Sequence, residues 1–146
     1  MTIGSKLRLP NVGDGNRSVR RSGTYYVRVR QSTLNRRQKL FDEALAAIER
    51  AYADEDISLA TVARSIATSR RQLQRVFGER HTSFRRELQR VRMARAAELL
   101  REDAMPVGAV ARAVGYRQPA QFSKAFRRHH GRPPSELRGA PRSLAA

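Results

Sequence analysis

Two segments of the sequence place hydrogen-bonding side chains on what we expect to be the outward face of a helix. In the first segment these positions are rich in guanidinium and amide groups: Arg70, Arg71, Gln74 and Arg75. A guanidinium fork matches the O6 and N7 acceptors of guanine, and a glutamine amide matches N6 and N7 of adenine. In the second segment the outward positions are poorer in polar groups: Pro119, Ala120, Gln121 and Lys124. Both sets are candidate base-reading residues, and we expect the first to carry more of the sequence discrimination.

Covalent and metal chemistry lack the residues that they need. The chain has no Cys, which excludes disulfides, thiolate ligands and cysteine nucleophiles. Its three histidines are His81, His129 and His130. The adjacent pair points to different faces of a helix, and no Ser or acid is obviously paired with any of the three. We therefore expect no enzymatic activity, no catalytic residue, no cofactor and no metal site.

The charge balance indicates a polyanionic partner. Lys and Arg number 30 against 13 Asp and Glu, which gives a formal net charge of +17. Each phosphate that a basic side chain neutralises releases condensed counterions, so we expect nucleic acid; solubility and an anionic membrane surface are the alternatives. No apolar run approaches the roughly 18 residues of a membrane span, and the N-terminus lacks the apolar part of a secretory signal. We expect a cytoplasmic, nucleoid-associated protein.

A repeated phrase predicts the elements that position these side chains. TVARSIATSRRQLQRVF at residues 61–77 returns as AVARAVGYRQPAQFSKAF at residues 109–126, with one extra residue in the middle. Each copy predicts a short helix, a tight turn and a second helix, which is a helix-turn-helix. Residues 83–103 predict a linker helix about 30 Å long, close to the roughly 34 Å of one turn of B-DNA. A single chain would then place two recognition helices in successive major-groove segments on one face of the duplex.

The predicted fold is all-α, with about seven helices arranged as two helix-turn-helix subdomains bridged by the long linker helix. Its expected divisions are a basic flexible arm over 1–31, a first subdomain over 32–82, the linker helix over 83–103, a second subdomain over 104–139 and a flexible tail over 140–146. Within the arm, Val27 and Val29 alternate with arginines, which indicates a short strand over 24–31, either paired with another segment or simply extended. Helical spacing of apolar residues begins at Leu34.

Helix ends and flanks hold side chains suited to the DNA backbone. We expect phosphate contacts from Ser69, Arg86, Arg117, Gln118, Arg127 and Arg128. Ser58 and Ser69 are also the expected N-caps of two helices. Gly115 is expected to end a helix. In the linker helix we expect one buried stripe, formed by Phe84, Leu88, Val91, Ala94 or Arg95, and Leu99.

Together these residues resemble the DNA-binding module of AraC/XylS-type bacterial transcription regulators. The most specific parts are VGYRQPAQFSKAFRRHHGRPPSELR near the C-terminus and RMARAAELL in the linker helix, and the similarity covers roughly residues 38–138. The resemblance implies an all-helical module of about seven helices that binds double-stranded promoter DNA, usually to activate transcription, with RNA polymerase as partner. It implies a short member of the family without an effector-binding domain, which we expect to act on DNA as a monomer.

The resemblance also assigns positions within the two recognition helices. The family's base-contacting positions fall here on Arg71, Gln74 and Arg75, and on Pro119, Ala120, Gln121 and Lys124. Two departures are His81, in place of a common glycine, and Lys124, in place of a common arginine. The alternative function is a nonspecific architectural DNA- or RNA-binding protein. The repeat argues against it, because nonspecific binding does not need two recognition helices at a set distance.

Overall fold

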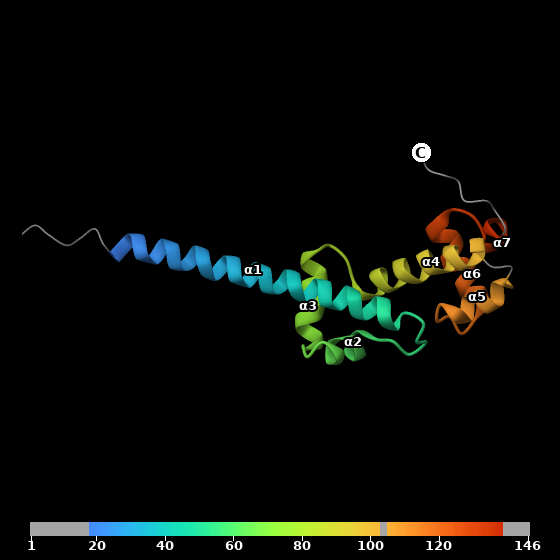
Figure 1. The fold of residues 1–146 in the computed structure, drawn as a ribbon, viewed down its shortest axis with the longest axis horizontal. Helices are drawn as coiled ribbons and strands as arrows, with labels where there is room; N and C mark the ends of the chain where they lie inside the picture. The colour runs from blue at the N-terminus through green and yellow to red at the C-terminus, as the bar shows by residue number, and fades with distance from the viewer. Residues whose placement is uncertain (1–17, 103–104, 139–146) are drawn as a thin grey trace, which may run out of the picture. The chain divides into compact units, whose positions relative to one another are not determined.

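A computed structural model of the chain describes residues 18–102 and 105–138, with side chains described from residue 30 onward (Figure 1). Every regular element in these ranges is a helix: α1 (Ser18–Ala51), α2 (Leu59–Ser65), α3 (Arg70–Glu79), α4 (Phe84–Glu102), α5 (Val107–Ala113), α6 (Pro119–His130) and α7 (Pro134–Leu137). The all-α prediction is therefore confirmed. The chain divides into two compact parts between Arg36 and Arg37, and both helix-turn-helix pairs lie in the C-terminal part. None of the helices described is both long and apolar enough to cross a membrane.

The strand expected over 24–31 is wrong, because α1 runs without a break from Ser18 to Ala51. A helix satisfies its backbone N–H and C=O groups within the segment, whereas a lone strand needs a partner strand, and the described ranges hold none. Residues 18–31 of the expected flexible arm are therefore helical. The rest of that arm, residues 1–17, and the tail over 140–146 lie outside the described residues.

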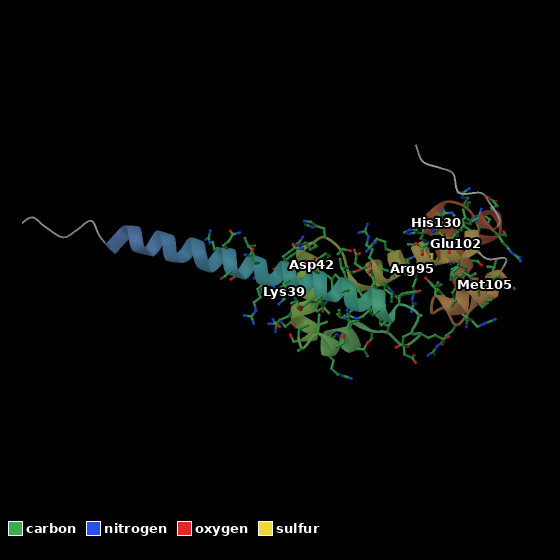
Figure 2. All side chains as sticks on the ribbon, viewed as in Figure 1. Lys39, Asp42, Arg95, Glu102, Met105 and His130 are labelled. Carbon is green, nitrogen blue, oxygen red and sulfur yellow. The ribbon has the colours of Figure 1, made fainter. Side chains whose placement is uncertain are left out.

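The first hydrophobic core joins the second half of α1 to α2, α3 and the start of α4. Its buried members are Ala44, Ala47, Ile48, Val62, Ala63, Leu73, Phe77, Leu88 and Val91. The ring of Phe41 packs edge-on against that of Phe77, with 5.7 Å between the ring centroids. Lys39 and Asp42 lie on the opposite, exposed side of α1 (Figure 2). The amphipathic pattern of α1 thus packs this half of the helix onto the first helix-turn-helix.

The second core joins α4, α5, α6 and α7. Its buried members are Met93, Ala96, Ala97, Leu100, Val110, Ala111, Val114, Phe122, Phe126 and Leu137. The ring of Phe126 lies 5.6 Å from that of Phe122 and 4.3 Å from that of His130. His130 Nε2 lies 3.2 Å from the Met93 carbonyl oxygen, and because a carbonyl can only accept, this nitrogen donates. Burial lowers the pKa of His130, which favours the neutral ring.

The linker helix α4 buries two different faces. Leu88 and Val91 near its start belong to the first core. The second core takes a later set: Met93, Ala96, Ala97 and Leu100. At roughly 100° per residue, the two sets lie on nearly opposite sides of the helix axis. The single stripe expected from the sequence is therefore wrong beyond Val91, since Ala94 and Arg95 are exposed and Leu99 is only partly buried. The buried stripe changes face because one part of α4 packs into the first core and the other part packs into the second.

Candidate nucleic-acid interface

The first helix-turn-helix is organised by local hydrogen bonds. In its turn, the Thr68 N–H donates to the Ala63 carbonyl at 2.9 Å, and Ala67 adopts a left-handed conformation with φ of 52°. Ser69 then caps α3 by accepting a backbone N–H from the first turn of that helix. Ser58 caps α2 in the same way. Both expected N-caps are confirmed, and they fix where α2 and α3 begin.

The helix α3 turns one face to the core and the other to solvent. Its inward residues are buried: Leu73, Val76 and Phe77. Its outward residues are exposed: Arg70, Arg71, Gln74 and Arg75. Arg75 donates from Nε to Glu79 at 3.2 Å, and Glu79 also pairs with Arg37 at 3.1 Å. The part of the chain that the structure describes offers no hydrogen-bond or ion-pair partner to the other three outward side chains, which leaves their polar groups available to a ligand.

The second helix-turn-helix has a turn one residue longer, as the repeat predicts. Residues 66–69 separate α2 from α3, whereas residues 114–118 separate α5 from α6. The Tyr116 N–H donates to the Ala111 carbonyl at 2.9 Å, which repeats the bond that closes the first turn. Gly115 has a φ of 84° and stands where the first turn has its left-handed alanine. The two turns therefore share one arrangement.

The helix α6 offers fewer polar groups than α3. Pro119 occupies its first position, and Gln118 before it forms no side-chain cap. The inward residues Phe122 and Phe126 are fully buried. The outward residues are exposed: Pro119, Ala120, Gln121 and Lys124. Only two of these four side chains can donate or accept a hydrogen bond, and neither has a partner among the described residues.

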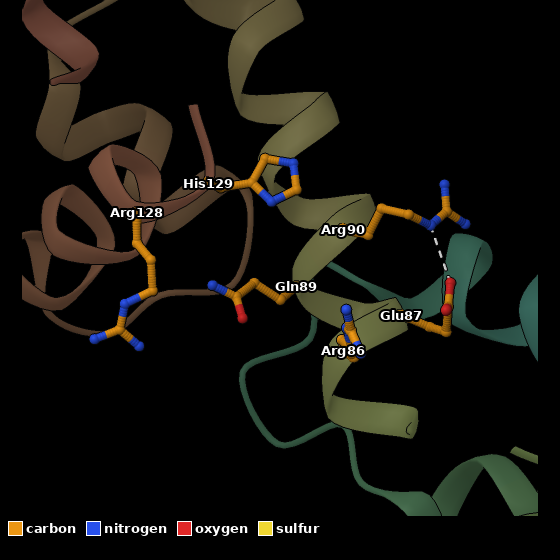
Figure 3. Close-up of a pocket in the computed structure, with 6 residues that line it drawn as sticks. All are labelled: Arg86, Glu87, Gln89, Arg90, Arg128 and His129. Carbon is orange, nitrogen blue, oxygen red and sulfur yellow. Dashed lines mark hydrogen bonds and ion pairs between the residues drawn. The ribbon is translucent and has the colours of Figure 1, made fainter. Parts of the chain in front are cut away.

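The side chains expected to contact phosphates are all exposed: Ser69, Arg86, Arg117, Gln118, Arg127 and Arg128. Two features of this set were not predicted. Arg117 is ion-paired, because its Nε donates to Glu55 at 2.8 Å and its Nη2 contacts Asp56. Arg86 and Arg128, from α4 and α6, line the same hollow (Figure 3). The structure thus places two of these arginines on the wall of one hollow, and it ties a third to an acidic loop.

Arg92 on α4 contacts both subdomains, a role that the sequence analysis did not predict although Arg92 begins the RMARAAELL segment. Its Nε donates to the Tyr52 carbonyl and its Nη2 to the Asp54 carbonyl, both at 2.8 Å. Its guanidinium carbon lies 5.4 Å from the centroid of the Tyr116 ring in the second turn, and Tyr52 packs against both cores. Burial lowers the pKa of Arg92, while Tyr116, Asp54 and Glu55 oppose that effect. The group remains charged, because an arginine is not deprotonated in a protein.

Gly115 makes room for this arginine. A Cβ at this position would lie 2.5 Å from Arg92 Nη2 and 2.8 Å from the Tyr52 carbonyl oxygen. One of these neighbours is backbone and cannot rotate away. The residue therefore does more than end α5, the role expected for it. It supplies the left-handed backbone of the turn, and it lets the linker helix approach that turn closely.

Two helix-turn-helix units on one bridging helix define a class of DNA-binding fold, and the comparisons with known proteins place the chain in a family. The family HTH_18, described as "Helix-turn-helix domain", matches residues 62–140, more than half of the chain. The protein belongs to this AraC/XylS-type helix-turn-helix family of transcription regulators.

Similar proteins agree with this assignment. The HTH-type transcriptional regulator GbdR of Pseudomonas aeruginosa is 36% identical over 101 residues, which are 68% of this chain and 28% of that protein. The chain spans under a third of the length of the curated relatives that it matches. A transcriptional regulator with an AraC-type DNA-binding domain from Chromobacterium violaceum aligns with a TM-score of 0.67 and 27% identity, over 75% of this chain and 96% of that one. The DNA-binding domain of AdpA, solved in complex with a target DNA, aligns with a TM-score of 0.61 and 25% identity, over 72% and 95%.

Proposed function

We propose that the protein is a sequence-specific transcription regulator that places α3 and α6 in successive major-groove segments of promoter DNA. The observation that carries the proposal is the pair of matched turns, residues 66–69 and 114–118, each followed by a helix with an exposed outward face. The helix α4 between them has 19 residues, so it is about 28 Å long, near the roughly 34 Å of one duplex turn. The similar AdpA domain was solved in complex with a target DNA, which supports the DNA-binding part of the proposal.

We assign most of the base readout to α3. Its unpaired guanidinium and amide groups, on Arg70, Arg71 and Gln74, suit guanine and adenine in the major groove. On α6, Gln121 and Lys124 supply the polar contacts, and the methyl group of Ala120 suits the methyl group of thymine. The remaining base-reading candidates are Arg75, already held by a carboxylate, and Pro119, which has no polar side-chain atom.

We place the backbone contacts at the ends of the two recognition helices, on Ser69, Arg117, Gln118 and Arg127. Arg117 must exchange its carboxylate partners for a phosphate to make such a contact. Because one chain carries both recognition helices, we propose that it binds DNA as a monomer. Activation, with RNA polymerase as partner, is the outcome usual in the family that this chain belongs to, and we propose it on that ground.

Selection of bound sequences from a random duplex library tests the proposal, at physiological salt and with competitor DNA. We expect enrichment of two short blocks about one helical turn apart, the block under α3 being better defined. A single enriched block would contradict the two-site arrangement and leave α6 as a backbone-binding element. Tight binding without any enrichment, with a steep dependence on salt, would contradict sequence specificity and leave a charge-driven architectural protein.

A pair of variants assigns the blocks to their helices. The double variant Arg71→Ala/Gln74→Ala is expected to lose the better-defined block and keep the other, because it removes donors from α3 alone. Arg50→Ala, an exposed arginine in the last turn of α1, is the control for loss of positive charge and is expected to keep both blocks. Persistence of both blocks in the double variant would show that α3 does not read bases.

A further inference from the structure

A hollow of about 310 Å³ lies between the start of α4 and the end of α6 (Figure 3). It is lined by Arg86, Glu87, Gln89, Arg90, Arg128 and His129. The first four come from the first two turns of α4, and the last two come from the last turn of α6. The hollow therefore forms where the end of α6 lies beside the start of the linker helix.

The charges around the hollow are unbalanced. Its one acid, Glu87, already accepts from Arg90 Nε at 2.9 Å and from the Thr82 hydroxyl at 2.7 Å. No ion pair within the described residues engages the guanidinium group of Arg86 or that of Arg128. Both guanidinium groups therefore lack a counterion within the described residues, and an anion bound in the hollow would supply one.

The α6 side of the hollow continues the outward face of that helix. Gln121, Lys124 and Arg128 follow one another at spacings of three and four, so they form one stripe. All three are exposed. A duplex that meets the first two residues of this stripe would run on toward the third, and so toward the hollow. The geometry favours the DNA backbone as the source of the anion.

We propose that the hollow holds one phosphate group of the DNA backbone, bound jointly by Arg86 and Arg128 at a point between the two groove segments. This inference rests on the proposed function. It differs from two separate contacts at two helix ends, because a single phosphate shared by α4 and α6 joins the two subdomains through the DNA. Substitution of either arginine is then expected to remove most of the binding free energy that the other arginine contributes.

A double-mutant cycle on duplex DNA tests this sharing. Arg86→Ala and Arg128→Ala are each expected to weaken binding about tenfold, to similar extents on all sequences, and to lower the salt dependence by about one phosphate. The double variant is expected to lose clearly less than the product of the two single losses. Additive losses would overturn the proposal. Both side chains are exposed, so thermal unfolding is expected to be unchanged, and measuring it excludes a folding defect.

Arg127 supplies the matched control. It is adjacent to Arg128, is equally basic and exposed, and does not line the hollow. The pair Arg86→Ala and Arg127→Ala is therefore expected to be additive. Coupling of the same size in this pair would show that the first cycle reports general charge rather than a shared phosphate, and would overturn the proposal.

The source of the phosphate is tested with modified DNA. A neutral methylphosphonate is placed at each backbone position of the selected duplex in turn. One position between the two blocks is expected to weaken binding of the unaltered protein and to have no effect on Arg86→Ala/Arg128→Ala. Inorganic phosphate is titrated without DNA as the second arm. Saturable binding of inorganic phosphate that the double variant loses, with DNA affinity unchanged by the same substitutions, would assign the hollow to a free anion and overturn the backbone assignment.

The two proposals fail separately. The cycle works on any duplex, because the phosphate is the same in every sequence. No enrichment from the random library, with the coupling intact, would remove the sequence-specific regulator and keep the shared phosphate. Clear enrichment with additive losses would keep the regulator and remove the shared phosphate.

Discussion

The two helix-turn-helix units repeat one arrangement, but their turns are held in different ways. In the first unit the contacts are local, and Ser69 caps the recognition helix with its own side chain. In the second unit α6 begins without a side-chain cap. Its turn keeps the local bond from the Tyr116 N–H to the Ala111 carbonyl, and it is also held from outside, by Arg92 against Tyr116 and by the pairing of Arg117 with Glu55. The first turn is therefore closed by contacts within its own subdomain, whereas the second also receives contacts from the linker helix and the loop after α1.

The left-handed residue of each turn shows the same difference. Ala67 in the first turn is exposed, and Gly115 in the second is buried. Both have a positive φ, of 52° and 84°. The first turn accepts a side chain because nothing approaches it from outside. The second turn has no room for one, because the linker helix and the end of α1 meet it there.

The largest expected effect comes from filling that space. Gly115→Ala puts a Cβ against Arg92 Nη2 and the Tyr52 carbonyl oxygen and imposes left-handed strain, so we expect a loss of about 3 kcal/mol in the free energy of unfolding. Urea denaturation measures it. A loss below about 1 kcal/mol would mean that the second turn adapts as readily as the first, which would remove the contrast between them.

Removing the arginine itself tests the docking directly. Arg92→Met keeps much of the side-chain volume but leaves the carbonyl oxygens of Tyr52 and Asp54 without their donor. We expect a loss of about 2 kcal/mol in unfolding free energy by urea denaturation. Arg95→Met on the same helix is the control, because Arg95 is exposed and its one ion pair within the described residues is with Glu98. We expect the urea midpoint of this variant to be unchanged. Equal losses in the two variants would show that docking does not depend on Arg92.

The next effect concerns binding rather than folding. Arg71→Ala is expected to lower affinity for the selected duplex about tenfold, and Gln121→Ala only about threefold, because we propose that α3 carries more of the readout. Fluorescence anisotropy measures the affinity of each variant for the selected duplex and for a scrambled duplex. A loss confined to the selected duplex reports lost specificity, whereas an equal loss on both reports lost charge. A larger loss for Gln121→Ala would reverse the proposed order of the two recognition helices.

The smallest effect is a gain in stability. Ala67→Gly relieves a left-handed alanine in an exposed turn, and we expect about 0.5–1 kcal/mol of added stability in urea denaturation. His81→Gly is a second instance, since His81 has a φ of 54° and is exposed. The family resemblance led us to expect a glycine at this position. A loss of stability on Ala67→Gly would show that this turn, too, depends on contacts from outside.

The sequence predicted what is local and missed what is distant. The two units, the longer second turn and the caps at Ser58 and Ser69 followed from spacing and residue type over a few positions. Arg92 was not predicted, because its partners Tyr52 and Asp54 precede it by 40 and 38 residues, and its helix is rich in arginine. Gly115 was recognised as a helix end, but its close contact with the linker helix had no sequence signal.

Two further predictions from the sequence were wrong for the same reason. The buried face of α4 was misplaced because a periodicity taken over the whole helix averages two stripes that point to different cores. Residues 24–31 of α1 were predicted to form a short strand because two valines alternate with arginines, a pattern that says nothing about whether a partner strand is present.

The two faces of α4 also fix a rotational phase. One residue inserted between Val91 and Met93 would turn the second recognition helix by about 100° about the axis of α4 and advance it by only 1.5 Å. Seven inserted residues, about two helical turns, would restore the phase and lengthen the linker by roughly 10 Å. In the proposed complex, the spacing between the two DNA segments can therefore change only in steps set by the helix period. The outward side chains of α3 and α6 can change one at a time, so the sequences that a lineage recognises can drift while their spacing stays fixed.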